Sequence, residues 1–272
     1  MPDLLNTSLT GMLAFQRALE TTGHNIANAN TPGYNRQVAQ FGTRIGSGSG
    51  SGYIGGGTQI TTIKRIYDEM LGEQLQSATS SHARFATLND LATRIDSLLA
   101  DPQTGLSSSI QSFFNAIQDV ANDPSSVPAR QAVLGEADGI LQRLHALDGR
   151  FAEVDSEVTQ RIQMSVTDIN RLADAVAEMN DQIALATGRT GQPPNDLLDQ
   201  RDLLIRQLGE HVSVSTAKQD DGTMNVFMGT GQVLVTGTRV KYLGTQGSEF
   251  DPTRLEIVYQ GAGGNTPLDS GL

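Results

Sequence analysis

The longest stretch of this chain without a strong helix breaker runs from about residue 128 to residue 187. It contains glycine only at Gly135, Gly139 and Gly149, and no proline after Pro128. Apolar residues recur along it at helical spacing, which predicts one helix of roughly 60 residues and on the order of 90 Å. A helix far longer than usual indicates a rod, a bundle or a coiled coil. Its apolar stripe comprises Ile140, Leu144, Leu147, Phe151, Val154, Val158, Ile162, Ile169, Leu172, Val176, Met179 and Ile183.

Two further helices are predicted before this long one. Helical apolar spacing covers residues 67–100 and again residues 107–122. Asp101-Pro102 is expected to end the first and Asp123-Pro124 the second, because proline cannot continue a helix. The centre of the chain therefore reads as a bundle of long helices.

Beyond Gly209 the apolar pattern changes to period two, which is typical of strands. Asp221-Gly222 supplies a hairpin turn between two of them. No strand evident in the last residues closes the sheet, so we expect an antiparallel β domain that is cut short. The predicted strands cover residues 211–216, 223–228, 232–235 and 255–259.

Residues 4–28 carry the pattern of one amphipathic helix. Its apolar positions follow a 4-3 spacing that is typical of a helix seam, and Gln16 and Gly23 weaken it. Two readings stay open: a helix packed on its own domain, and a helix that orders only when subunits stack against it. The second reading predicts a subunit interface made of Leu5, Leu9, Met12, Leu19 and Ile26.

A turn and a glycine-rich tract follow this helix. Pro32-Gly33 favours a turn, after which residues 46–57 are dominated by glycine and serine. Such a tract predicts a flexible linker; a phosphate-binding loop would need a following Gly-Lys-Ser/Thr, which is absent. The β-branched run over 59–66 predicts a strand. The turn residues of interest are Asn28, Asn30, Thr31, Pro32, Gly33 and Tyr34.

Together these patterns predict a mainly α chain with a β domain, divided into four parts. An N-terminal helix and turn occupy residues 1–42, and the linker and strand occupy 43–66. A helical rod covers 67–208 and the β domain covers 209–272.

Composition excludes several classes of function. The formal net charge is −11, and no basic cluster offsets it, which argues against nucleic acid as a partner. Only 38% of residues are hydrophobic and 5% aromatic, so thin apolar layers are expected rather than one deep core. No cysteine is present, and no run is long and apolar enough to span a membrane. The first residues lack the pattern of a cleavable signal, so any export is expected to use another route.

No residue pattern points to catalysis, a cofactor or a metal. The histidines His24, His82, His145 and His211 are scattered and form no zinc-binding spacing. The strongest acidic pattern repeats at every third residue of a short predicted helix, Asp196 to Leu208, that Asn195 is expected to cap. That pattern favours a solvated face with Arg201 and Arg206 nearby over a cation site. It consists of Asp196, Asp199 and Asp202.

Several motifs carry a resemblance to a known family. Residues 8–12 and 27–34 resemble the N-terminal signature shared by bacterial flagellar rod, hook and hook-associated proteins. Further segments are similar to the hook–filament junction members of that family, over residues 1 to about 240. They are residues 65–71 with 74–75, 101–107, 113–116, 122–124, 129–134 and 196–202.

The resemblance implies a secreted, structural protein of the extracellular flagellum. Members are exported unfolded through the flagellar type III channel, and form a homo-oligomeric ring on the hook protein. The second hook-associated junction protein and then the filament assemble on that ring. Their N-terminal helix pairs with a C-terminal helix, which has no counterpart here, and their length is roughly twice that of this chain. The chain is thus expected to be an N-terminal portion, with any export chaperone binding the missing part.

Two alternatives remain. A distal rod or hook protein of the same axial family would share residues 8–12 and 27–34, but usually lacks the long central helix. A glycan-cleaving enzyme would need a pair of carboxylates across a cleft, and the sequence singles out no such pair.

Overall fold

The structure is a computed structural model that describes residues 4–49, 52–99, 106–229, 231–249, 254–261 and 264–268. The chain divides into two compact units. The first comprises Met1–Ser81, Thr167–Gly244 and Val258–Leu272, and the second His82–Val166 and Thr245–Ile257. The helices and antiparallel strands described below confirm the predicted mainly α chain with a β domain.

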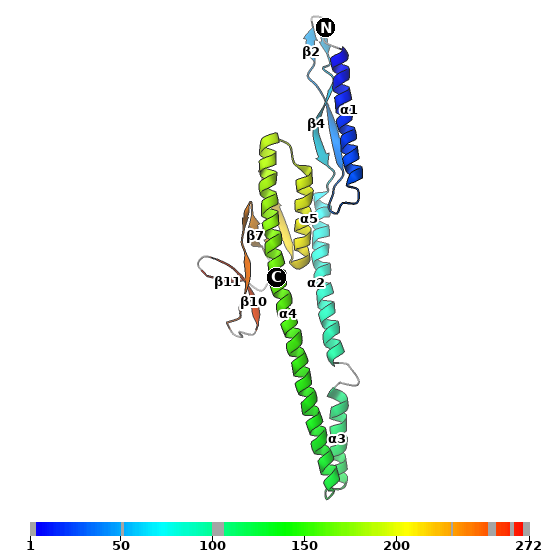
Figure 1. The fold of residues 1–272 in the computed structure, drawn as a ribbon, viewed down its shortest axis with the longest axis vertical. Helices are drawn as coiled ribbons and strands as arrows, with labels where there is room; N and C mark the ends of the chain where they lie inside the picture. The colour runs from blue at the N-terminus through cyan, green and yellow to red at the C-terminus, as the bar shows by residue number, and fades with distance from the viewer. Residues whose placement is uncertain are drawn as a thin grey trace. The chain divides into compact units, whose positions relative to one another are not determined.

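The first unit begins with a helix packed on a pair of strands (Figure 1). Helix α1 (Leu4–Ala27) lies along the antiparallel strands β1 (Gln37–Thr43) and β4 (Thr58–Arg65). The small buried side chains of Thr10, Ala14 and Thr21 let the helix approach the strands closely. The Thr10 hydroxyl accepts a hydrogen bond from the Thr58 N–H at 3.3 Å. One reading of the sequence, a helix packed on its own domain, therefore describes this face of α1.

The glycine-rich tract is not simply a linker. Strands β2 (Ser47–Ser49) and β3 (Gly52–Ile54) pair antiparallel within it, which corrects the prediction of a flexible segment for these residues. Strand pairing uses backbone groups, so a tract made mostly of glycine and serine can still form two short paired strands.

Three helices continue the first unit. They are the beginning of α2 (Glu69–Leu99), the end of α4 (Val127–Thr190) and all of α5 (Asn195–His211). Helices α2 and α5 approach closely, because a Cβ at Gly209 would lie only 3.2 Å from the Ser80 hydroxyl oxygen. The prediction that the Asn195 side chain caps α5 was wrong. Asn195 is the first helical residue, Pro194 precedes it, and no side chain caps the helix.

A four-stranded antiparallel sheet packs beside α4 and α5 (Figure 1). Its order is β5 (Val214–Lys218), β6 (Met224–Met228), β7 (Gln232–Thr236) and β8 (Arg239–Val240). A second sheet has the order β11 (Thr266–Pro267), β10 (Leu255–Tyr259), β9 (Leu243–Gly247). The apolar core of this region lies in both helices and strands: Leu172, Ala173, Val176, Ile183, Ile205, Leu208, Val226, Met228, Leu234 and Val235 are all nearly inaccessible.

Two asparagines of α4 join the helix to the β domain. The Asn170 side chain donates to the Leu243 carbonyl at 2.8 Å and accepts from the Leu243 N–H at 2.9 Å. Asn180, fully buried, donates to the carbonyls of Met224 and Gly237 and accepts from the Met224 N–H. Because each amide pairs with backbone groups at fixed positions, these bonds set the register of the strands on the helix.

The second unit is helical. It contains the end of α2, helix α3 (Leu106–Asn122) and the beginning of α4. Ion pairs join α2 to α4: Arg94 with Glu157, and Arg161 with Asp90 at 3.3 Å. The expected stop at Asp101-Pro102 lies outside the described residues, whereas α3 ends at Asn122 as predicted. At 64 residues, α4 confirms the predicted long helix.

Among the described residues, no helix combines the length and the apolar character needed to cross a membrane.

Candidate functional site

The predicted seam of α1 is uncovered in this structure. All five of its residues are exposed, with fractions of 80% for Leu5, 50% for Leu9, 68% for Met12 and 72% for Leu19 and Ile26. They share one helix with the buried Thr10, Ala14 and Thr21, so the two sides of α1 differ sharply. Each large apolar side chain gains roughly 1.5–3 kcal/mol when fully removed from water. The row is therefore a surface with a strong tendency to become covered.

The turn after α1 is held together by asparagine side chains. The Asn25 amide pairs with the main chain of Gln37, donating to its carbonyl and accepting from its N–H, both at 2.8 Å. The Tyr34 hydroxyl donates to the same Asn25 oxygen at 2.7 Å. Asn28 donates to the His24 carbonyl and accepts from the Thr31 hydroxyl. These bonds fold the predicted turn back against the end of α1.

Glycine is required at the centre of the turn. Gly33 has a φ of +81°, a conformation that strains residues with a Cβ. A Cβ there would also lie 3.0 Å from the Cβ of Leu203 on α5. The turn is thus seated directly on α5, which the sequence did not indicate.

Polar contacts between this turn, β4 and α5 form what we call the turn–α5 cluster: Asn35, Gln37 and Arg65 with Asp196, Asp199 and Asp202. Asp199 accepts from the Asn35 N–H at 2.8 Å, from the Asn35 side chain at 2.7 Å and from Arg65 at 2.9 Å. Arg65 also donates to Asp202 at 2.7 Å. The Gln37 amide donates to Asp196 at 2.6 Å.

The prediction that the three aspartates form a solvated face was wrong for Asp199 and Asp202, whereas the Asp196 side chain is 56% exposed. Asp199 is 5% exposed, and its carboxylate is occupied by the turn and by Arg65. Arg201, expected among the solvated charges, is 1% exposed and donates instead to Asn180 and to the Gly222 carbonyl. Among the described residues, no three His, Asp or Glu side chains are placed to hold a metal ion.

Two carboxylates share one guanidinium in this cluster, and the pKa values reflect it. Burial acts to lower the pKa of Arg65, but Asp202 and Asp199 outweigh it and raise that pKa above its ordinary value. Burial raises the pKa of Asp202 although Arg65 opposes the shift. Burial, followed by the charges of Asp196 and Asp199, likewise raises the pKa of Tyr34. The cluster thus holds Arg65 firmly charged, and the raised pKa makes Asp202 easier to protonate than an ordinary aspartate.

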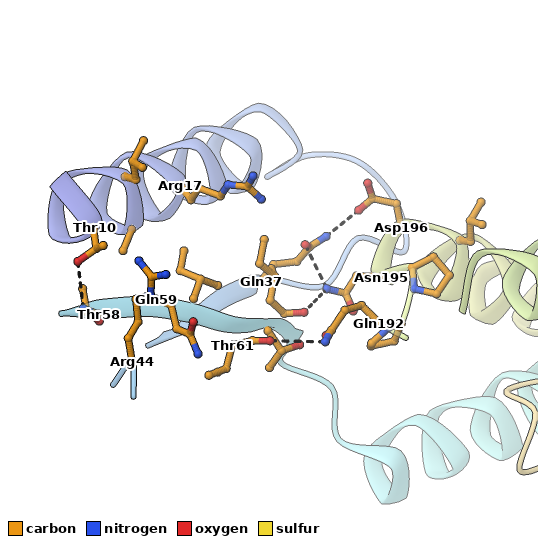
Figure 2. A pocket seen from close by; sticks show the side chains of 18 residues that line it. Thr10, Arg17, Gln37, Arg44, Thr58, Gln59, Thr61, Gln192, Asn195 and Asp196 are labelled. Carbon is orange, nitrogen blue, oxygen red and sulfur yellow. Dashed lines mark hydrogen bonds between the residues drawn. The ribbon is translucent and has the colours of Figure 1, made fainter. Parts of the chain in front are cut away.

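A groove of about 790 Å³ lies between α1, β4 and the residues that lead into α5 (Figure 2). Arg17 lines it from α1, and Arg44 lines it from the segment after β1. At the end beside α5, the Asn195 side chain donates to the Gln37 side-chain oxygen and to the Ile63 carbonyl (Figure 2). Its apolar lining includes Leu13, Ala14, Ile60, Ile63, Pro193 and Leu197.

Sequence reasoning found the turn but missed what holds it. Of the six predicted turn residues, Asn28, Thr31, Gly33 and Tyr34 make the contacts described above. The Asn30 side chain makes no hydrogen bond with another described residue, and Pro32 adds only its fixed backbone angle. The missed residues are Asn25, Asn35, Gln37 and Arg65. The every-third-residue spacing of aspartates in α5 was the one available signal, and it was assigned to solvent.

Comparison with known proteins places these features in a family. The family model described as flagellar hook-associated protein FlgK helical domain matches residues 92–272. The model described as flagella basal body rod protein matches residues 5–35.

Curated relatives and a solved structure agree with the family models. Flagellar hook-associated protein 1 of Salmonella typhimurium strain LT2 is 38% identical over 100% of this chain and 50% of its own length. The Bacillus subtilis strain 168 protein of that name is 27% identical over 94% of this chain and 52% of its own length. The chain thus spans about half the length of these relatives. The flagellar hook junction protein FlgK from Burkholderia pseudomallei superposes with a TM-score of 0.66 at 30% identity, over 72% of this chain and 36% of that one.

Proposed function

Because the chain belongs to the flagellar hook-associated protein FlgK family, we propose that it is a structural component of the bacterial flagellum. In this proposal it forms the junction between hook and filament, outside the cell, and serves as the platform on which the filament assembles. The match of the helical-domain family to residues 92–272 carries the proposal.

The proposed role is mechanical and not enzymatic. The charged residues that the fold brings together, Arg65, Asp199 and Asp202, are engaged with one another and with the turn. A glycan-cleaving site would instead need two carboxylates facing an open cleft. A peptidoglycan-cleavage assay on the purified protein is expected to give no product.

The exposed seam of α1 is the proposed contact between subunits. It is apolar, runs along one helix and lies on the opposite side from residues that α1 packs on its own strands. Burying Leu5, Leu9, Met12, Leu19 and Ile26 would couple ordering of the N-terminal helix to assembly. The proposed partners are further copies of the chain, the hook protein and the second hook-associated junction protein. An export chaperone would bind the remaining part of a longer chain.

A rod or hook protein is the second candidate, because the rod-protein family model matches residues 5–35. That match covers only the N-terminal helix and turn, whereas the hook-associated model covers the long helix and the β domain. The longer match favours the junction.

Electron microscopy of cells lacking the gene tests the proposal. Bare hooks, with flagellin released into the medium as monomer, are expected. If hooks are absent, the protein would instead be assigned to the rod or hook. Normal filaments would overturn the flagellar assignment.

Complementation of the same cells tests the seam. Leu9→Asp or Ile26→Asp is expected to block incorporation without reducing helicity, because each places a charge in the apolar row. Leu185→Asp is the matched control, since Leu185 on α4 is similarly exposed, at 52%. Normal incorporation of the α1 variants would exclude the seam as an interface.

A further inference from the structure

The groove beside α1 carries two positive charges that nothing else in the described structure uses. Arg17 and Arg44 are both exposed and line the groove from different elements (Figure 2). Neither guanidinium has a hydrogen bond or ion pair with another described residue. The acidic group in the lining, Asp196, is already engaged with Gln37 and lies 3.3 Å from the His24 ring nitrogen. An anionic partner could therefore bind both arginines without displacing an existing contact.

Part of the groove lining is apolar. Leu13, itself 53% exposed, and Ile60 and Ile63 contribute to its lining. A partner suited to it must present apolar side chains and negative charges together, because charge alone would leave this lining in water. In a chain with a net charge of −11, such a concave basic surface is complementary to much of the protein's own surface.

One other surface of the same unit has the matching chemistry. The start of α2 exposes the apolar side chains of Met70 (70%) and Leu71 (63%). Beside them Glu69 and Glu73 are exposed, and neither carboxylate has a hydrogen bond or ion pair with another described residue. Residues four apart lie one above the other on a helix face, so these two carboxylates point the same way. We call residues 66–75 the α2 start.

We propose that the groove of one copy receives the α2 start of a second copy, with Glu69 and Glu73 facing Arg17 and Arg44, and Met70, on the adjoining side of the helix, on the apolar lining. This inference rests on the proposed assembly of many copies. The two surfaces are different patches of one unit, so the contact is heterologous: each copy offers one and accepts the other. Heterologous contacts generate rings or helical arrays and do not stop at a dimer.

A rival acidic surface on α4 fits less well. Asp174, Glu178 and Asp181 recur on one face of that helix. Asp174 already accepts from the Tyr242 hydroxyl at 2.8 Å, and Glu178 accepts from Gln182 at 3.1 Å. Among the described large apolar side chains near it, Leu185 is 52% exposed and Tyr242 is 44% exposed, both less than Met70 and Leu71. This stripe serves as the matched control surface.

Charge reversal in both surfaces tests the contact in cells. Arg17→Glu with Arg44→Glu, or Glu69→Arg with Glu73→Arg, is expected to lower incorporation into purified hook–basal bodies by about tenfold or more, because like charges would face each other. Combining all four changes is expected to restore incorporation to within about threefold of the unchanged protein, since the pairs are re-formed with opposite polarity. The control, Glu178→Arg with Asp181→Arg, is expected to incorporate normally. Circular dichroism should be the same for all variants, because every changed side chain is exposed.

Cysteine cross-linking tests the pairing directly, because the chain contains no cysteine. Gln59, an exposed residue of the groove (Figure 2), and Met70 are each replaced by cysteine. A mixture of Gln59→Cys and Met70→Cys chains, assembled on hooks and treated with a short bis-maleimide, is expected to give dimers only. Chains that carry both changes should give a ladder of higher oligomers.

The possible failures are distinguishable. If the unchanged protein does not incorporate at all, the proposed function fails before this inference is tested. If the unchanged protein incorporates but charge reversal has no effect, only the groove contact is wrong. The same holds if the variant with all four changes does not regain incorporation. Cross-links within single chains would assign the groove to another segment of the same polypeptide and overturn a contact between copies.

Discussion

Helix α5 lies between two contacts of opposite character. On one side Ile205 and Leu208 join the apolar core formed with α4 and the β domain, where Val226 and Leu234 are also fully buried. On the other side Asp196, Asp199 and Asp202 hold the turn and β4 almost entirely through hydrogen bonds and ion pairs. The two contacts share one short helix but differ in the forces that maintain them.

The difference teaches what each contact can do. Apolar burial is non-directional and roughly proportional to the area removed from water, so the β domain is fixed mainly by the area it covers. A charged network is directional, and it depends on the protonation of each member. The orientation of the turn and of β4 on α5 is therefore specified by particular atoms, and single changes can loosen it without unfolding the core.

The largest effect is expected in the apolar contact. Leu234→Ala should lower the free energy of unfolding by about 2–5 kcal/mol, because a fully buried leucine leaves a cavity behind. Leu185→Ala, at an exposed leucine, should change it by less than about 0.5 kcal/mol. Urea denaturation followed by circular dichroism measures both. Equal effects would mean that the β domain is not held by its core.

A smaller effect on stability, confined to the contact of α5 with the turn and β4, is expected for Arg65→Gln. Removing the guanidinium leaves Asp199 and Asp202 uncompensated, at a cost of about 2–3 kcal/mol, less than for a fully buried pair because Arg65 is partly exposed. Hydrogen exchange should accelerate in the turn and β1 and stay unchanged in β6 and β7. Lys64→Gln is the control, because Lys64 is the exposed residue next to Arg65. Faster exchange throughout the β domain would show that the two contacts are not independent.

The seating of the turn on α5 can be examined through Gly33. Gly33→Ala should cost about 1–2 kcal/mol, because alanine is strained at a φ of +81° and its Cβ would meet Leu203 at 3.0 Å. Gly191→Ala isolates the first cause, since its φ is +66° but nothing lies within 4 Å of the added Cβ. Thermal unfolding should show a greater loss for Gly33→Ala; equal losses would exclude the steric contact with Leu203 as a cause.

The smallest effect concerns pH. Burial raises the folded-state pKa of Asp202 above its ordinary 3.8, so the stability contributed by its protonation is fully present below pH 3.8 and is lost as the pH rises through the folded-state pKa. Asp202→Asn cannot titrate. We subtract the unfolding free energy of the variant from that of the unchanged protein. This difference should fall as the pH rises from 3.8 through the folded-state pKa of Asp202. A difference that rises with pH instead would mean that the ion pair with Arg65 outweighs burial.

Local sequence patterns predicted most of the helices and strands. The long helix, α3 and the strands around Val226 and Val258 lie where apolar spacing and breakers indicated, because those signals arise within a few neighbouring residues. The pairing of residues 47–49 with 52–54 was missed, since a segment made mostly of glycine and serine carries little side-chain pattern for strands that are paired through their backbone.

The sequence by itself determined the long helix, the change to strands after Gly209, and the apolar row of α1, although the exposure of that row is seen only in the structure. The turn was visible too, through Pro32 and Gly33. Only the tertiary structure decided the fate of the polar residues. Asp199 and Arg65 are 134 positions apart, yet they form an ion pair at 2.9 Å, and Arg201 is buried against Asn180. Whether a charge faces water or a partner depends on which distant segment packs against it, and no local periodicity encodes that.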